Sequence, residues 1–232
     1  MRIAGIQGLS LIDFPGNVAS VLFLAGCDFR CPFCQNPDLI EISADTPKFS
    51  WEDVVEFLRH RKKLIDGVAI TGGEPMLFPD IADFVAHLNE EIGLPVKIDT
   101  NGHHPDVLKQ LLEDGHVTYV AMDVKTALSR YSEASGTLVD IHKIEQSIRL
   151  IMQSGVRYEF RTTVVPTVVD EAAVDEMGKV IEGAELWAFQ QYQNRIVYNE
   201  NFKAVKPLTP EKVRALMMRA EPYVKRVIVR GL

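Results

Sequence analysis

The feature that most constrains the fold of this chain is a repeated alternation of short apolar segments with segments of helical periodicity. The apolar segments predict β-strands at residues 18–24, 67–71, 95–99, 117–122, 156–165, 185–189 and 224–229. Strands that alternate with helices of roughly 10–15 residues indicate right-handed βαβ units. The chain therefore predicts an α/β fold built on one parallel sheet.

The number of units favours an open barrel. We expect six βα units and a terminal strand in 232 residues, whereas a complete eight-unit barrel takes about 250 residues. We therefore predict a partial (β/α)6 TIM-like barrel, with a doubly wound open sheet as the main alternative because periodicity does not fix strand order. The predicted organisation is a single domain over 1–232, with an N-terminal extension (1–17), a partial barrel core (18–200) and a C-terminal helix and strand (201–232).

Charge and composition limit the classes of partner. The net charge of −7 argues against a general nucleic-acid or anionic-membrane binder. No apolar run approaches the roughly 20 residues that a membrane-spanning helix needs, and the N-terminus lacks the apolar core of a signal peptide. Clustered thiols with no cysteine elsewhere fit a reducing cytosol. We expect a cytoplasmic protein with no nucleic-acid or membrane partner.

All three cysteines lie in one segment, where Cys27, Cys31 and Cys34 are spaced C-x3-C-x2-C. Thiolate is a soft ligand that selects iron–sulfur clusters, zinc or copper. A structural zinc site needs four nitrogen or sulfur ligands, and no histidine lies in this segment. Zinc and unliganded core thiols are therefore the less favoured interpretations, and an iron–sulfur cluster is the favoured one. A four-iron cluster held by three thiolates leaves one iron without a protein ligand.

Polar motifs follow the predicted strands at their carboxyl ends. In barrels and in doubly wound sheets, ligands collect at this end of the strands. The motifs are Cys27, Gly72-Gly73-Glu74, Asp99-Thr100-Asn101-Gly102, Asp123-Val124-Lys125 and Gln190-Gln191. One such motif carries little weight, but several at the same end of a sheet predict a single site.

Two of these motifs suggest how a ligand is held. Gly72 and Gly73 let a backbone come close to a ligand and Glu74 offers an acceptor for an ammonium group, with a plain strand-to-helix turn as the alternative. Asp123 and Lys125 flank one residue, so both side chains point the same way in an extended segment. Beside a cluster, the lysine would meet a carboxylate and the aspartate a hydroxyl or a cation. The alternative is a surface ion pair.

Three further patterns favour ordinary structural roles. His103 and His104 lie at a turn before a proline, and we expect the adjacent rings to diverge rather than to bind a metal. Met217 and Met218 lie in a predicted helix and are expected in the core. The basic run 59–63 is interpreted as a solvated helix end, where cations favour the negative end of the dipole. Docking of an electron donor on this run is the less favoured alternative.

With these residues the chain resembles the radical S-adenosylmethionine (SAM) superfamily, whose signature is C-x3-C-x-aromatic-C, with Phe33 at the aromatic position. Within it, the chain resembles the activating enzymes of glycyl radical enzymes. It is most similar to the anaerobic ribonucleoside-triphosphate reductase activating proteins, and it also resembles the pyruvate formate-lyase activating enzymes. The matching stretches are 10–16, 26–38, 71–75, 99–102 and 122–125. The resemblance weakens beyond Pro166.

The resemblance implies a cofactor set and a set of site residues. Cys27, Cys31 and Cys34 would hold a [4Fe-4S] cluster, and SAM would chelate the fourth iron through its amino and carboxylate groups. Lys125 would join the cysteines in catalysis. The residues implied to bind SAM are Phe33, Gly72, Gly73, Glu74, Asp99, Thr100, Asn101, Asp123, Lys125, Arg161 and Thr163.

The resemblance also implies finer roles. Phe33 would lie near the adenine, Glu74 with its two glycines would hold the amino end of SAM, and Asp123 with Lys125 would engage the rest of it. Arg161 and Thr163 would approach the ribose or the carboxylate.

Three implied features concern neighbours of SAM. The equivalents of Asp99, Thr100 and Asp123 help to bind a monovalent cation in the formate-lyase activators. Asp13 matches an aspartate that contacts the glycyl loop of the protein substrate. Tyr192-Gln193 falls where those activators carry a histidine, so that SAM contact differs here.

The implied reaction is the reductive cleavage of SAM to methionine and a 5′-deoxyadenosyl radical, which removes hydrogen from a glycine of a partner. The implied partners are a glycyl radical enzyme as protein substrate and flavodoxin or ferredoxin as electron donor. A partial barrel suits such a substrate because a folded protein must insert a loop through a wide lateral opening. The alternatives are a small radical SAM enzyme that acts on a free metabolite, similar to 7-carboxy-7-deazaguanine synthase, and a non-enzymatic module with a structural metal.

Overall fold

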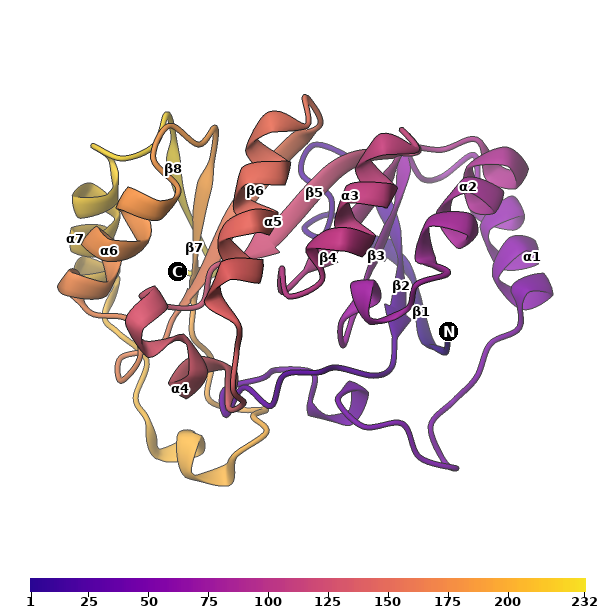
Figure 1. The fold of residues 1–232 in the computed structure, drawn as a ribbon. Helices are drawn as coiled ribbons and strands as arrows, with labels where there is room; N and C mark the ends of the chain where they lie inside the picture. Colours follow the sequence, from indigo (N-terminus) through magenta and orange to yellow (C-terminus); the bar gives the residue numbers. More distant parts are fainter.

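The computed structural model describes residues 1–232 and contains one eight-stranded sheet whose strands follow each other in chain order (Figure 1). The strands are β1 (Ile3–Ser10), β2 (Ala19–Leu24), β3 (Gly67–Gly72), β4 (Val96–Thr100), β5 (Val117–Asp123), β6 (Arg157–Val164), β7 (Trp187–Gln191) and β8 (Val227–Arg230). β1 pairs antiparallel with β2, and every later pair is parallel. The strand order does not reverse, as it does in a doubly wound sheet. The predicted partial barrel is therefore confirmed.

Helices cover one face of this sheet, as Figure 1 shows for all the longer ones. They are α1 (Trp51–Arg61), α2 (Ile81–Ile92), α3 (Pro105–Glu113), α4 (Tyr131–Ser135), α5 (Ile141–Gln153), α6 (Glu171–Val180) and α7 (Pro210–Ala220). Single 3-10 turns lie at Pro37–Leu39, Pro75–Leu77, Leu128–Arg130 and Glu200–Ala204. Because each connecting helix returns the chain to the same end of the sheet, the carboxyl ends of the parallel strands stand side by side.

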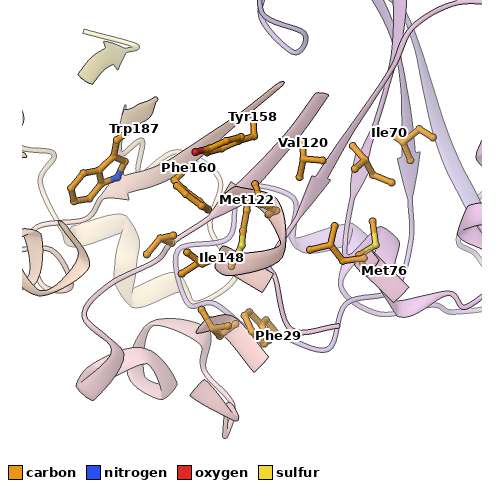
Figure 2. Close-up of a cluster of buried hydrophobic side chains, with 14 of the residues drawn as sticks. Phe29, Ile70, Met76, Val120, Met122, Ile148, Tyr158, Phe160 and Trp187 are labelled. Carbon is orange, nitrogen blue, oxygen red and sulfur yellow. The ribbon is translucent and has the colours of Figure 1, made fainter. Parts of the chain in front are cut away.

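The main core fills the space between the sheet and the helices and contains 51 buried residues. Figure 2 shows Val120, Met122 and Phe160 of neighbouring strands in this cluster, together with Ile148 from α5. Phe29 belongs to the same cluster and is 2% exposed, although it lies in the cysteine segment. Burying an aromatic side chain contributes about 1.5–3 kcal/mol, so the core itself anchors the loop that carries the thiols.

A second, smaller cluster lies on the other face of the sheet. Phe14 is fully buried there against Ala19, Tyr119 and Ala121, and its ring centroid lies 5.9 Å from that of Tyr119. The connection between β1 and β2 therefore folds over the face that the helices leave free. None of the helices combines the length and hydropathy of a membrane-spanning segment.

Candidate functional site

The carboxyl ends of the parallel strands surround a cavity of about 360 Å³. Every residue to which the resemblance assigned a role in catalysis, in cofactor binding or at the substrate loop lines this cavity. These residues are Asp13, Cys27, Cys31, Phe33, Cys34, Gly72, Gly73, Glu74, Asp99, Thr100, Asn101, Asp123, Lys125, Arg161 and Thr163. Gln190 lines it as well, whereas Gln191 lines a neighbouring cavity. The strand-end motifs are thus brought together as predicted, while the roles of single residues stay predictions.

The three cysteines are free thiols on a loop that is fixed along its length. Gly26 donates its backbone N–H to the Leu39 carbonyl at 2.8 Å, and Arg30 donates its own to the Ser135 carbonyl at 2.7 Å. Burial raises the pKa of Cys27 to about 12 and that of Cys31 to about 11. Soft thiolate donors that share one cavity fit an iron–sulfur cluster with three protein ligands, and cluster binding must remove the thiol protons.

The two glycines of the Gly72-Gly73-Glu74 motif are required by the protein's own backbone. A Cβ atom on Gly73 would lie 2.1 Å from the Gly26 carbonyl oxygen, and one on Gly72 would lie 2.2 Å from the Leu24 carbonyl oxygen. The backbone N–H groups of Gly73 and Glu74 donate to these same carbonyls, at 2.7 and 2.8 Å. The turn after β3 is therefore pressed against β2 and the cysteine loop, and it lines the cavity from that position.

Glu74 is 1% exposed, and its carboxylate already accepts three hydrogen bonds. The donors are the Met76 N–H at 2.9 Å, the Thr100 hydroxyl at 2.7 Å and the Asn101 N–H at 2.6 Å. Burial raises the pKa of Glu74 to about 7, although the three hydrogen bonds by themselves would lower it. A carboxylate has about four lone-pair positions, so one position stays open for the ammonium group that the sequence predicts there.

A chain of buried charges crosses the cavity wall from β4 to the segment after β5. Lys97 pairs with Asp99, and Arg161 reaches both Asp99 and Asp123, at 3.0 and 2.9 Å. Lys125 Nζ lies 3.2 Å from Asp123 Oδ2, so the two side chains do point the same way, and neither is a solvated surface group. The side chains of Asp123 and Lys125 are 32% and 13% exposed.

This arrangement bears on the monovalent cation implied by the resemblance. Both of its expected carboxylate ligands, Asp99 and Asp123, are paired with cationic side chains of the chain itself. The Thr100 hydroxyl donates to Glu74. Three cationic groups already face two carboxylates, so these residues do not fit a further cation, and we assign none.

The adjacent histidine rings do not diverge, so that part of the prediction was wrong. His103 Nδ1 lies 2.7 Å and His104 Nε2 lies 3.0 Å from the same oxygen, Asp28 Oδ2, and Asn101 Nδ2 donates to the other oxygen of that carboxylate at 2.9 Å. The hydrogen bond to Asp28 raises the pKa of His104. Both rings lie between β4 and α3 and point toward the cysteine loop, where they meet Asp28. Asp28 follows Cys27 directly, so this cluster ties the thiol loop to the end of β4.

Two other structural predictions have mixed outcomes. Met217 packs against the core as expected, whereas Met218 is 59% exposed, because the two side chains lie on different faces of α7. The basic run 59–63 is largely exposed, as predicted for a solvated helix end. It precedes β3 and therefore lies at the amino end of the sheet, away from the cavity.

Sequence reasoning also missed some residues that line the cavity. Gln7 of β1 and Gln35, next to the last cysteine, both contribute to the wall. Gln7 could have been found from the sequence, because side chains alternate along a strand and this alternation assigns Gln7 to one face of the sheet. No local pattern distinguishes Gln35 from any exposed loop glutamine.

Comparison with known proteins identifies the family. The sequence model of the Radical SAM superfamily matches residues 21–180. A protein of Methanocaldococcus jannaschii, provisionally named glycyl-radical enzyme activating enzyme MJ1227, is 34% identical over 235 residues, which cover 99% of this chain and 96% of that protein. The pyruvate formate-lyase-activating enzyme of Clostridium pasteurianum is 28% identical over 177 residues, which cover 73% of this chain and 71% of that enzyme.

Solved structures share the fold at low sequence identity. SuiB of Streptococcus suis superposes with a TM-score of 0.65 at 17% identity, over 91% of this chain and 48% of SuiB. The chain thus spans about half the length of this structure. Three thiols and a set of strand-end polar groups in one cavity fit the cofactors of the matched family. The chain belongs to the radical SAM superfamily, whose enzymes use a [4Fe-4S] cluster and SAM.

Proposed function

We propose that this enzyme activates a glycyl radical enzyme by removing a hydrogen atom from a glycine of that protein. The observation that carries the proposal is the cavity in which Cys27, Cys31 and Cys34 lie with Glu74 and Lys125. The M. jannaschii protein supports the proposal. It is 34% identical to this chain over 99% of the chain's length, and its provisional name gives this activity.

The protein's own groups can hold SAM at both ends of its amino-acid part. Lys125 presents an ammonium group to a carboxylate, and the open lone-pair position of Glu74 can accept from an amino group. Phe33 is 6% exposed and lines the cavity, and we expect it to lie next to the adenine. A [4Fe-4S] cluster held by the three cysteines would, once reduced, supply the electron for the cleavage of SAM. The cavity walls would orient the reacting groups and exclude water.

The proposed partner is an anaerobic ribonucleoside-triphosphate reductase, with flavodoxin or ferredoxin as the electron donor and the cytoplasm as the compartment. A glycyl radical enzyme is a folded protein, so its glycine must reach the cavity on a loop. The edge strands β1 and β8 do not pair with each other, which leaves the barrel open on one side.

The test is a mixing experiment under anaerobic conditions. The protein is reconstituted with iron and sulfide and incubated with SAM, dithionite and the glycyl radical enzymes encoded in the same genome. We expect 5′-deoxyadenosine in the products and a glycyl doublet by electron paramagnetic resonance with one of these partners. A Cys31→Ser variant is the matched control, and it should give neither signal.

The outcomes separate the candidate functions. SAM cleavage without a glycyl signal from any partner would contradict the proposal and favour a free metabolite as substrate. A colourless zinc protein that forms no 5′-deoxyadenosine would contradict the whole radical mechanism.

A further inference from the structure

Asp28, His103 and His104 form a compact group of metal-ligating side chains outside the cavity. His103 Nδ1 lies 2.7 Å and His104 Nε2 lies 3.0 Å from Asp28 Oδ2, and the three ligand atoms all lie within 4.8 Å of one another. None of these residues lines the cavity that holds the cysteines. The proposed function therefore assigns no chemistry to this group.

The two imidazole rings are arranged so that a nitrogen of each faces the same point. Their planes are 70° apart and their centroids 5.6 Å apart, so the rings do not stack. A tetrahedral Zn²⁺ ion with bonds of about 2.0–2.1 Å holds its ligand atoms about 3.3 Å apart. The distances from the ring nitrogens to Asp28 Oδ2 need to increase by only about half an ångström to admit such an ion.

Neighbouring residues hold the three ligands in place. Asn101 Nδ2 donates to Asp28 Oδ1 at 2.9 Å, and Asn101 Oδ1 accepts the backbone N–H of His103 at 2.9 Å. The ring of Phe29, which belongs to the main core, packs against the ring of His103 with the centroids 5.4 Å apart. Partners that orient metal ligands in this way contribute to metal affinity. The ligand set is therefore preorganised on its outer side.

The group is open to solvent, and its surroundings suit a cation. The side chains of Asp28, His103 and His104 are 19%, 18% and 25% exposed, so an ion can enter and keep water as a further ligand. The negative charge of Glu74 raises the pKa of His104 more than the positive charge of Lys143 lowers it. The field at the ring nitrogens is therefore favourable for a positive ion.

We infer that Asp28, His103 and His104 bind a divalent transition-metal ion, and that Zn²⁺ is the ion this ligand set suits. Imidazole and carboxylate are the ligands that Zn²⁺ takes in sites with three protein ligands and a water molecule, and Fe²⁺ binds such ligands more weakly. Asp28 follows Cys27, and the histidines follow β4, so the ion ties the thiol loop to the sheet. This second metal site is separate from the thiols and does not depend on which partner the enzyme activates.

The test uses the holoenzyme with its cluster assembled and oxidised, handled without oxygen. An equimolar amount of Zn²⁺ is added, unbound ion is removed by desalting, and zinc, iron and sulfide are determined together. X-ray absorption at the zinc edge then identifies the ligands, because Zn–N and Zn–O bonds are about 2.0–2.2 Å long and Zn–S bonds about 2.3 Å.

The variants are His104→Gln and the double substitution His103→Gln/His104→Gln. His60→Gln is the matched control, because the side chain of His60 is 75% exposed on α1, outside the group. The Tm of each protein is measured with and without Zn²⁺. The Tm without added ion shows whether a variant is folded, so weaker zinc binding is not confused with unfolding.

We expect wild type and His60→Gln to retain one zinc ion per chain at unchanged iron and sulfide, with nitrogen and oxygen ligands only. His104→Gln should bind Zn²⁺ at least about tenfold more weakly, because even partners that merely orient a ligand contribute 10–100-fold to affinity. Zn²⁺ should raise the Tm of wild type but not that of the double variant, since an ion that binds the folded state stabilises it.

Three results would overturn the inference. A wild-type holoenzyme that retains no zinc lacks the site. Sulfur among the zinc ligands, or iron lost as zinc enters, would show that the ion occupies the cysteines instead. Equal zinc affinity in wild type and the double variant would show that the histidines are not ligands.

Discussion

The guanidinium of Arg161 lies between two carboxylates, with Nη1 3.0 Å from Asp99 Oδ2 and Nε 2.9 Å from Asp123 Oδ1. The three residues come from β6, β4 and β5, so one side chain joins three neighbouring strands at their carboxyl ends. Because all three are largely buried, the arrangement depends on complete pairing of the charges.

Removal of this guanidinium should destabilise the protein strongly. Arg161→Met leaves two partly unpaired carboxylates in the cavity wall, and we expect a loss of about 3–5 kcal/mol in the free energy of unfolding. Arg219→Met is the control, since Arg219 pairs with Asp175 on the surface, where solvent screens the charges and the pair should contribute little. Urea unfolding measures both. Equal losses of unfolding free energy in the two variants would show that the buried carboxylates do not depend on pairing with Arg161.

The same network predicts how stability depends on pH. Burial by itself would raise the pKa of Asp99, but the charges of Arg161 and Lys97 outweigh it and hold the pKa at about 2, below its ordinary value of 3.8. A carboxyl group whose pKa is lower in the folded state stabilises that state above the ordinary value and loses this contribution as the pH falls toward the folded value. The contribution of Asp99 should therefore disappear between about pH 4 and pH 2.

Thermal unfolding of wild type and Asp99→Asn tests this dependence. We expect a clear difference in Tm at about pH 5 that narrows steadily below about pH 4. A difference that stays constant down to the lowest pH at which both proteins fold would contradict the assignment.

Asp28 should control how firmly the cluster is held. Its carboxylate binds Asn101, His103 and His104, and it follows a cysteine ligand in the chain. Partners that orient metal ligands typically contribute 10–100-fold to metal affinity, so Asp28→Ala should lose iron to a chelator about tenfold faster than wild type. Asp38→Ala is the control, because that residue is exposed on the same loop region. The rate of iron loss is read from the decrease in visible absorbance. Equal rates in Asp28→Ala and wild type would show that Asp28 does not help to hold the cluster.

Gly73 should tolerate no side chain. A Cβ atom there would lie 2.1 Å from the Gly26 carbonyl oxygen, which is backbone and has no freedom to yield. Gly73→Ala should therefore displace the cysteine loop, with incomplete cluster assembly and a loss of stability of about 1–3 kcal/mol from overpacking. Gly5→Ala is the control, since its Cβ would meet only ordinary contacts at 3.5 Å. Iron content and Tm of the two variants give the result, and an intact cluster in Gly73→Ala would contradict the prediction.

Much of the fold and of the candidate site could be predicted because both follow from local patterns. Alternating strands and helices specify parallel pairing, and parallel strands bring their carboxyl ends together. Motifs that follow consecutive strands, such as Gly72-Gly73-Glu74 and Asp123-Val124-Lys125, therefore had to meet in one cavity.

The contacts that sequence reasoning missed depend on distances that no local pattern encodes. Asp28 and His104 are 76 residues apart in the chain, and they meet only because the cysteine loop packs beside the end of β4. Arg161 was expected at the SAM ribose or carboxylate, and its pairing with both Asp99 and Asp123 follows from strand register. The glycines at 72 and 73 were explained by a ligand, whereas their closest neighbours are carbonyl groups of the protein.

In the proposed reaction, a hydrogen atom passes from a glycine of a partner protein to the 5′-deoxyadenosyl group in this cavity. The most direct measurement is a single-turnover reaction with a partner whose glycines carry deuterium on Cα, followed by mass spectrometry of the 5′-deoxyadenosine. We expect one deuterium in this product, together with a glycyl radical signal on the partner. Formation of 5′-deoxyadenosine without deuterium, at the same rate with and without the partner, would contradict it.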